Sequence, residues 1–188
     1  MRILVTGAAG FIASHIIEEL IKSEEVQEII GIDNFLSGKQ SNLDHNLEHD
    51  KFSFYQSDIR NYEEIIEYSK DCDAIIHHAA LVSVPLSMEK PILTEEINVT
   101  GTINLLEACR INRIKRFVYA SSSAVYGDCK VTPLKETNTG NLLSPYAISK
   151  LVNEYYSGLY SSLYDIQTIG FRYFNVFGPK QNPNSPYT

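Results

Sequence analysis

Residues 6–13, TGAAGFIA, determine the expected fold because they place two glycines and a small residue between two apolar segments. The segment before them, residues 2–6, is a short apolar run typical of a buried strand. The segment after them, residues 11–22, carries apolar side chains at helical spacing. A glycine-rich turn between a strand and a helix is typical of phosphate-binding loops, but such turns also occur where nothing is bound. The rest of the chain has to decide between the two.

The same alternation of apolar runs and helical patterns continues along the chain. Strands are expected at residues 28–33, 51–58, 73–80, 114–122 and 166–174, helices at 61–70, 92–112 and 145–163, and loops at 34–50, 81–90 and 123–144. Strands and helices that alternate in this way form βαβ units, whose strands lie parallel and whose helices cover the sheet. The sequence therefore predicts an α/β fold with a doubly wound parallel sheet and helices on both faces.

Composition and charge narrow the class of protein. Of the 188 residues, 44% are apolar and 21% charged, which is typical of a globular chain rather than a disordered one. The net charge of -7 argues against a nucleic-acid partner, since phosphates require a basic surface. Cys72, Cys109 and Cys129 form no CxxC pair, which favours a reducing, cytoplasmic location. No apolar run approaches the ~18 residues of a membrane span.

The turn and the second strand together indicate a dinucleotide site. Gly7 permits a tight turn, Gly10 lets a pyrophosphate approach a helix N-terminus, and Ala13 lets that helix pack closely on the strand. Asp33 ends the second strand, where a carboxylate can accept hydrogen bonds from ribose hydroxyls. It would repel a 2′-phosphate, and no basic residue follows before Lys39. We therefore expect NAD rather than NADP.

Other titratable residues allow simpler interpretations. Asp58 ends the third strand and either contacts the adenine or caps the next helix, for which Asn61 is also a plausible cap. His77 and His78 are adjacent in a predicted strand and face opposite sides, which makes a shared metal site unfavourable, so no metal is expected. The carboxylates at 18, 19, 24 and 25 are expected on a solvated helix face.

A second group of residues points to proton transfer. Residues 121–123 are three serines that follow the fifth strand, at the sheet edge where ligands gather in open α/β folds. Tyr146 and Lys150 lie one helical turn apart on one face. A nearby ammonium favours the ionised phenol, so the pair could move a proton while a nicotinamide moves a hydride. On spacing alone, an ordinary amphipathic helix after a polar loop is the simpler interpretation.

Seven motifs along the chain, taken with their order and separations, favour the catalytic interpretation over the ordinary amphipathic helix. They are TGAAGFIA, DNFLSGK, HHAA, INVTGTINLLEA, SSSAVYGD, SPYAISK and FRYFNVFGP. Together they resemble the extended short-chain dehydrogenase/reductase family, in particular its NAD-dependent nucleotide-sugar epimerases of the UDP-glucose and UDP-N-acetylglucosamine 4-epimerase type. The resemblance implies a Rossmann-type NAD-binding domain over residues 1–174. Residues 175–188 would then begin a substrate-binding region, and we expect this chain to be truncated within it.

The resemblance also implies roles for individual residues. It assigns catalysis to Ser122, Tyr146 and Lys150, with Ser123 as the second choice for the serine. It implies NAD contacts from Gly7, Gly10, Phe11, Ile12, Asp33, Asn34, Ser37, Gly38, Asp58, Ile59, Ala79, Ala80, Asn98, Tyr146, Lys150 and Phe174. It implies contacts with the UDP-sugar substrate from Ser83, Val84, Ser122, Ser123, Tyr146 and Asn175. It further implies a homodimer formed through the helices at 92–112 and 145–163.

The reaction implied by the resemblance is epimerisation at C4 of the sugar. Tyr146 takes the hydroxyl proton, NAD takes the hydride, and the hydride returns to the other face of a transient 4-keto sugar. Relatives that eliminate water or decarboxylate usually carry acids where this chain has Ser123 and Ala124. That difference favours epimerisation over a dehydratase or decarboxylase. An NAD-binding module without turnover in this truncated chain stays open as the alternative.

Overall fold

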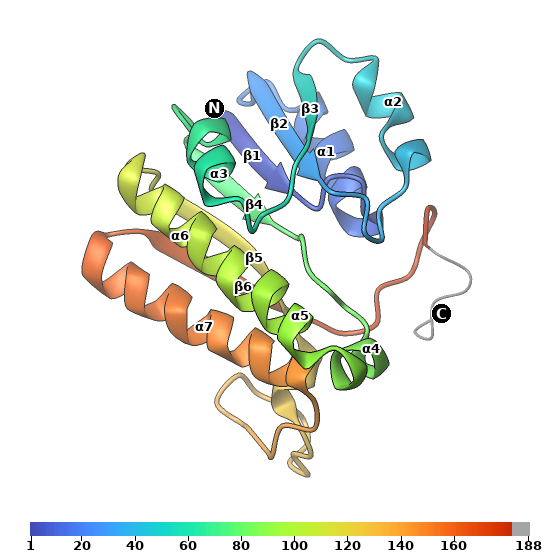
Figure 1. Cartoon of the computed structure of the whole chain (residues 1–188), viewed down its shortest axis with the longest axis vertical. Coiled ribbons are helices and arrows are strands. Elements are labelled where there is room, and N and C mark those ends of the chain that lie inside the picture. Colours follow the sequence, from blue (N-terminus) through green and yellow to red (C-terminus); the bar gives the residue numbers. More distant parts are fainter. Residues whose placement is uncertain (182–188) are drawn as a thin grey trace.

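Six parallel strands form one sheet at the centre of the structure, a computed structural model that describes residues 1–181 (Figure 1). The strands are β1 (Arg2–Thr6), β2 (Glu28–Asp33), β3 (Phe52–Gln56), β4 (Ala74–His77), β5 (Arg116–Ser122) and β6 (Gln167–Tyr173). Their order in the sheet is β3-β2-β1-β4-β5-β6. The direction of winding reverses between β1 and β4, and open α/β sheets bind ligands at such a switch point. The predicted α/β class and the doubly wound parallel sheet are confirmed.

Helices lie on both faces of this sheet (Figure 1). One face carries α1 (Phe11–Lys22) and the short α2 (Asp44–Leu47), and the other carries α3 (Tyr62–Tyr68), α6 (Gly101–Ile111) and α7 (Pro145–Tyr164). The remaining elements are η1 (Gln40–Asn42), α4 (Val84–Glu89), α5 (Pro91–Glu95), the π-helical turn η2 (Glu96–Thr100) and η3 (Ser123–Tyr126). Among residues 1–181, no helix has the length and apolar character needed to cross a bilayer.

Two apolar cores, one on each face, explain why the strands read as continuous apolar runs. Successive strand residues point to opposite faces, so Leu4 joins the core under α6 while Ile3 and Val5 join the core under α1. In the same way Ile75 packs under α6 and Ala74 under α1. Both cores hold the strands in a fixed register, which places the carboxyl ends of β1, β4 and β5 at one edge.

Four expectations about local structure are wrong. Only loops were expected at three places, but residues 34–50 contain η1 and α2, residues 81–90 contain α4, and residues 123–144 begin with η3. The start of α4 does have a local cause, because the Ser83 side chain accepts a hydrogen bond from the Leu86 backbone and Pro85 lies in the first turn. The helix expected at 92–112 is interrupted by the π turn η2, which inserts an irregular turn that periodicity does not reveal.

Candidate active site

The turn between β1 and α1 leaves an open helix N-terminus at the switch point. Gly7 has φ +71°, and a Cβ there would lie 2.7 Å from the backbone nitrogen of Ala79, so only glycine fits. The Gly10 nitrogen donates to the Gly7 oxygen at 2.8 Å, and Gly10 caps α1 without a side-chain hydrogen bond. Residues 11–14 contain no acid. The first N–H groups of such a helix have no intrahelical partner, which favours an anionic ligand.

Asp33 lies directly beside this turn. Its carboxylate accepts hydrogen bonds from the backbone nitrogens of Ala9 at 3.1 Å and Phe35 at 2.7 Å. A Cβ on Gly38 would lie 2.7 Å from the Ala9 side chain and 3.0 Å from Asp33 Oδ1. Burial raises the pKa of Asp33 above its ordinary value, and the two backbone donors oppose that rise. The acid therefore joins the glycine-rich turn to the loop after β2.

Asp58 is held by an ion pair on the same edge. It accepts from Asn34 Nδ2 at 2.8 Å and from Arg60 Nη2 at 2.8 Å, and the hydrogen bond from Arg60 lowers the pKa of Asp58 to about 2. Asn61 caps α3, since its side chain accepts from the Glu64 nitrogen. The interpretation of Asp58 as a helix cap is therefore wrong, and that of Asn61 is confirmed.

The start of α7 brings Tyr146 and Lys150 to the end of β5. The Ser144 side chain caps the helix by accepting from the Ala147 nitrogen at 3.1 Å. Tyr146 and Lys150 are both buried, and Lys150 Nζ lies 5.9 Å from the centre of the Tyr146 ring. Lys150 Nζ also donates to the carbonyl oxygen of Ala120 at 2.8 Å. Burial lowers the pKa of Lys150 to about 8, which leaves the amine mostly charged at neutral pH.

The serines lie at the same place. Ser122 is the last residue of β5, and its Oγ accepts a hydrogen bond from the Ala124 nitrogen at 3.1 Å. Ser123 begins η3, while Ser121 is buried. Because Lys150 is bonded to Ala120, two residues before Ser122, the structure brings the three predicted catalytic residues to one edge of the sheet.

Asn98 connects this group to the end of β4. It lies in the π turn, is 1% exposed, and its Nδ2 donates to Leu81 O at 3.1 Å and to Ser149 Oγ at 3.0 Å. Its Oδ1 accepts from the Leu81 nitrogen at 2.8 Å. The amide thus fixes the chain after Ala79 and Ala80 against α7. The π turn is the feature that aims this side chain, and sequence periodicity carries no signal for it.

Sequence reasoning missed a buried hydrogen-bond chain behind the glycine turn. Thr102 Oγ1 donates to Asn98 O at 2.6 Å and lies 3.0 Å from His77 Nε2, so that ring nitrogen carries the proton. Thr6 Oγ1 then donates to His77 Nδ1 at 2.7 Å and accepts from the Ala79 nitrogen at 3.2 Å. Burial holds the pKa of His77 well below its ordinary value. The neutral ring therefore aligns the ends of β1 and β4.

His77 and His78 do face different surroundings, as the strand pattern predicts. His78 Nε2 lies 3.2 Å from the Tyr173 hydroxyl on β6, whereas His77 contacts Thr6 and Thr102. No group of three or more His, Cys, Asp or Glu side chains suited to a metal ion occurs within residues 1–181.

The remaining predicted residues lie around this edge. Ser83 caps α4 and Val84 begins it, while Ile59 is buried against Gly101. Phe174 is exposed after β6, with its ring 6.0 Å from that of Tyr126. Asn34, Ser37 and Asn175 are in the exposed loops after β2 and β6.

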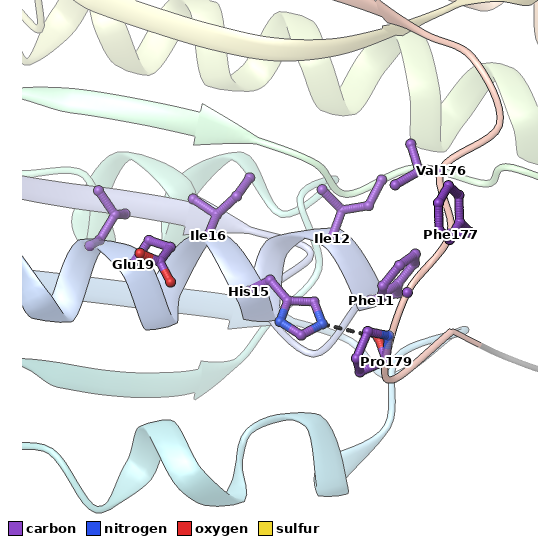
Figure 2. Close-up of a pocket in the computed structure, with 10 residues that line it drawn as sticks. Phe11, Ile12, His15, Ile16, Glu19, Val176, Phe177 and Pro179 are labelled. Carbon is purple, nitrogen blue, oxygen red and sulfur yellow. Dashed lines mark hydrogen bonds between the residues drawn. The ribbon is translucent and has the colours of Figure 1, made fainter.

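Phe11 and Ile12 contribute side chains to a different place. Figure 2 shows both pointing away from the sheet edge into an apolar pocket between α1 and residues 176–179. His15 Nε2 lies 3.0 Å from Pro179 O at its rim, and Lys180 Nζ contacts Glu18. Only the backbones of Phe11 and Ile12 therefore lie at the helix N-terminus. The expected solvated face is wrong for Glu18, because Lys180 partly covers it.

Comparison with known proteins agrees with this geometry. Residues 3–188 match the model of the NAD dependent epimerase/dehydratase family. The chain is 36% identical over 188 residues to a UDP-glucose 4-epimerase of Mycolicibacterium smegmatis, covering 98% of this chain and 59% of that protein.

Two solved structures are similar throughout. A UDP-N-acetylglucosamine 4-epimerase from Methanobrevibacter ruminantium, in complex with UDP-N-acetylmuramic acid, aligns with a TM-score of 0.92 and 39% identity, covering 99% of this chain and 58% of that one. A Thermus thermophilus UDP-glucose 4-epimerase in complex with NAD aligns with a TM-score of 0.86 and 36% identity, covering 100% and 59%. The chain thus spans less than two thirds of each relative. It belongs to the NAD dependent epimerase/dehydratase family.

Proposed function

We propose that this chain is the cofactor-binding part of an NAD-dependent UDP-sugar 4-epimerase, with Ser122, Tyr146 and Lys150 as its catalytic residues. The observation that carries the proposal is the buried Lys150 ammonium, which is bonded to the end of β5 and lies beside the Tyr146 ring. Structural ion networks rarely leave a lysine buried without a carboxylate partner, whereas proton-transfer sites use such a group.

The residues at the switch point fit NAD. A Cβ on Gly7 would collide with Ala79 and one on Gly38 with Ala9, so the turn and the loop after β2 pack as tightly as is typical of a dinucleotide-binding fold. Asp33 supplies a carboxylate at the ribose position and would repel a 2′-phosphate. The residues proposed to hold NAD are Gly7, Gly10, Phe11, Ile12, Asp33, Asn34, Ser37, Gly38, Asp58, Ile59, Ala79, Ala80, Asn98, Tyr146, Lys150 and Phe174. The Thermus thermophilus relative, solved with NAD, supports this assignment.

The protein's own groups account for the proton movements. Bound NAD supplies reversible hydride transfer. The Tyr146 phenol, which lies beside the Lys150 ammonium, removes the proton of the 4-hydroxyl as C4 becomes a ketone. Ser122 holds the sugar oxygen by a hydrogen bond. After the 4-keto sugar turns over in the site, Tyr146 returns the proton and the opposite configuration forms at C4.

The dehydratase half of the family name describes a different reaction. Dehydration requires an acid and a base near C5 and C6, and this chain has Ser123 and Ala124 at the start of η3 instead of carboxylates. This observation favours epimerisation. Ser83, Val84, Ser122, Ser123, Tyr146 and Asn175 are proposed to contact the UDP-sugar, which the names of the relatives indicate as UDP-glucose or UDP-N-acetylglucosamine.

The domain boundaries are also part of the proposal. Residues 1–174 would form the NAD-binding domain and residues 175–188 the beginning of the substrate-binding region, of which 182–188 lie outside the described residues. Exposed Phe171, Phe174 and Phe177 support an apolar surface at this junction. A cytoplasmic location is proposed from the pattern of cysteines alone.

We propose a homodimer through α5, α6 and α7. Ile148, Tyr155 and Leu159 recur at helical spacing on α7 and are exposed, as is Ile92 on α5. Sedimentation equilibrium should give a dimer for the wild type and a monomer for a Tyr155→Lys/Leu159→Lys variant. Val131→Lys, which alters an exposed apolar residue in the loop between η3 and α7 rather than on a helix of the interface, should stay dimeric. A monomeric wild type would refute the interface.

The experiment for the function is product analysis with NAD and a panel of UDP-sugars. An epimerase converts one C4 epimer into the other without accumulating reduced nicotinamide. A dehydratase releases water and leaves a deoxy-keto sugar. Tight NAD binding with no sugar product would instead support a binding module without turnover.

A further inference from the structure

Glu154 and Arg172 form a partly buried, bidentate ion pair between α7 and β6. Arg172 Nε lies 2.9 Å from Glu154 Oε1, and Nη2 lies 2.7 Å from Oε2. The Arg172 side chain is 14% exposed and the Glu154 side chain 18%. Two parallel charge-assisted hydrogen bonds fix both distance and orientation, which a single contact would not do.

Both partners also hold other segments. Ser121 Oγ donates to Glu154 Oε1, so the carboxylate binds the residue that precedes Ser122 on β5. Arg172 Nη1 donates to the carbonyl oxygen of Glu136 at 3.0 Å, and its guanidinium carbon lies 4.8 Å from the centre of the Tyr126 ring. One ion pair therefore joins α7, β5, β6 and the loop that follows η3.

The position of Glu154 on α7 relates this pair to the site. Tyr146, Lys150 and Glu154 follow one another at intervals of four residues, so they share one side of the helix over successive turns. Lys150 bonds to Ala120 O, and Glu154 bonds to Ser121, the next residue of β5. The two contacts together set the rotation of α7 about its axis.

Small rotations of α7 would be costly for a reaction at Tyr146. Its hydroxyl lies about 9 Å from the helix axis, given a Cα radius of about 2.3 Å and the length of the side chain, so a rotation of about 10° moves it by about 1.5 Å. A displacement of that size lowers the rate of a positioned reaction by up to about 100-fold. A buried ion pair, in contrast, adds little stability over an apolar pair of equal volume.

We propose that Glu154 and Arg172 are positioning residues, which fix the rotation of α7 so that Tyr146 and Lys150 stay aligned with Ser122. This inference rests on the proposed function, since the alignment matters for turnover. The pair acts only through the helix and the strand that it joins.

The test compares three variants with a matched control. Glu154→Met/Arg172→Met replaces the pair by apolar side chains, Arg172→Lys keeps the charge but loses the two-pronged geometry, and Glu154→Gln keeps the shape but loses the charge. The control is Asp165→Asn, which removes the exposed pair with Lys115 at the other end of α7 and β5 and tolerates the left-handed backbone there.

The readouts are urea unfolding, NAD affinity, kcat and KM of the complete polypeptide, and an NMR titration of the Lys150 Cε signal, assigned with Lys150→Met. The double variant should keep its unfolding midpoint and its NAD affinity within a few-fold, while kcat falls about 10- to 100-fold with little change in KM. The Lys150 midpoint should rise from about 8 toward 10.5, because a looser helix lets water reach the amine. In Arg172→Lys and Glu154→Gln, kcat and the Lys150 midpoint should change in the same direction as in the double variant. Asp165→Asn should match the wild type in both.

Several results would overturn the positioning role. An unchanged kcat and Lys150 midpoint in the folded double variant would do so, as would a kcat that falls only in proportion to stability. If all three variants fail to fold, the pair is structural and the proposal is wrong. A wild type without turnover on any UDP-sugar would instead refute the proposed function, and the Lys150 titration would still decide whether the pair sets the helix.

Discussion

Lys150 Nζ donates a hydrogen bond to the carbonyl oxygen of Ala120 at 2.8 Å, and this contact fastens α7 to β5 two residues before Ser122. The amine is buried and forms no ion pair with a carboxylate within residues 1–181, so its environment disfavours the charge. Burial of the Lys150 amine lowers the stability of the protein but places an amine of lowered pKa next to Tyr146. Such a combination is common at proton-transfer sites.

The first prediction concerns the pH dependence of stability at Lys150. The folded-state pKa of about 8 lies below the unfolded value of 10.5, so between these values only the unfolded chain binds the proton. The free energy of unfolding should therefore rise with pH across this window, by about 3 kcal/mol at most. Lys150→Met should lack this rise. Urea unfolding at a series of pH values measures it, and parallel profiles for the two proteins would contradict the burial of the charge.

The second prediction concerns Gly7. Gly7→Ala forces a left-handed backbone on a residue with a Cβ and places that Cβ against Ala79, so it should destabilise the protein by about 2 kcal/mol and weaken NAD binding more than 10-fold. Gly158→Ala is the control, because a Cβ there meets nothing within 4 Å in the middle of α7. It should stabilise the protein by about 0.5–1 kcal/mol. Equal effects of the two substitutions on urea unfolding would refute this account of the turn.

The third prediction concerns cofactor selectivity at Asp33. Asp33→Asn should weaken NAD binding by about 1.5 kcal/mol, or roughly 10-fold, because ribose hydroxyls lose a charged acceptor. It should also narrow the preference for NAD over NADP. Calorimetric titration with both nucleotides measures this, with Asp50→Asn, an exposed acid, as the control. A variant with unchanged NAD and NADP affinities would rule out the ribose contact.

The fourth prediction concerns acid stability at His78. Burial, followed by the charge of Lys150, lowers its pKa from 6.5 to about 4. Only the unfolded chain binds this proton between those values, so stability should fall by up to about 3 kcal/mol as the pH drops from 6.5 to 4. His78→Gln should show a shallower fall, because it removes the proton that His78 binds in the unfolded chain while the buried His77 remains. An unchanged slope in acid unfolding would show that His78 is hydrated in the folded state.

Local patterns predicted those parts of the fold that depend on neighbouring residues. The bounds expected for β1, α1 and β2 agree with the structure because each is a single apolar run or stripe between glycines or polar turns. Features that depend on contacts between distant segments could not be predicted from local patterns. Short α4 buries too few residues to show a period, and the contacts of Asn98 with Leu81 and Ser149 join elements far apart in the sequence.

The candidate site shows the same division. Spacing predicted that Tyr146 and Lys150 share a helix face, and strand order predicted that the serines lie at the same sheet edge. Neither spacing nor strand order revealed that Lys150 bonds to β5, or that Arg172 and Glu154 join β6 to α7. Those contacts arise from the docking of α7 on the sheet, which no local pattern encodes.

The most direct measurement is the interconversion of C4 epimers of a UDP-sugar by the complete polypeptide with NAD, compared between the wild type and Tyr146→Phe. Loss of the phenolic proton acceptor should lower kcat at least about 100-fold and leave NAD affinity within a few-fold. Full turnover in Tyr146→Phe, or failure of the wild type to bind NAD, would contradict the account.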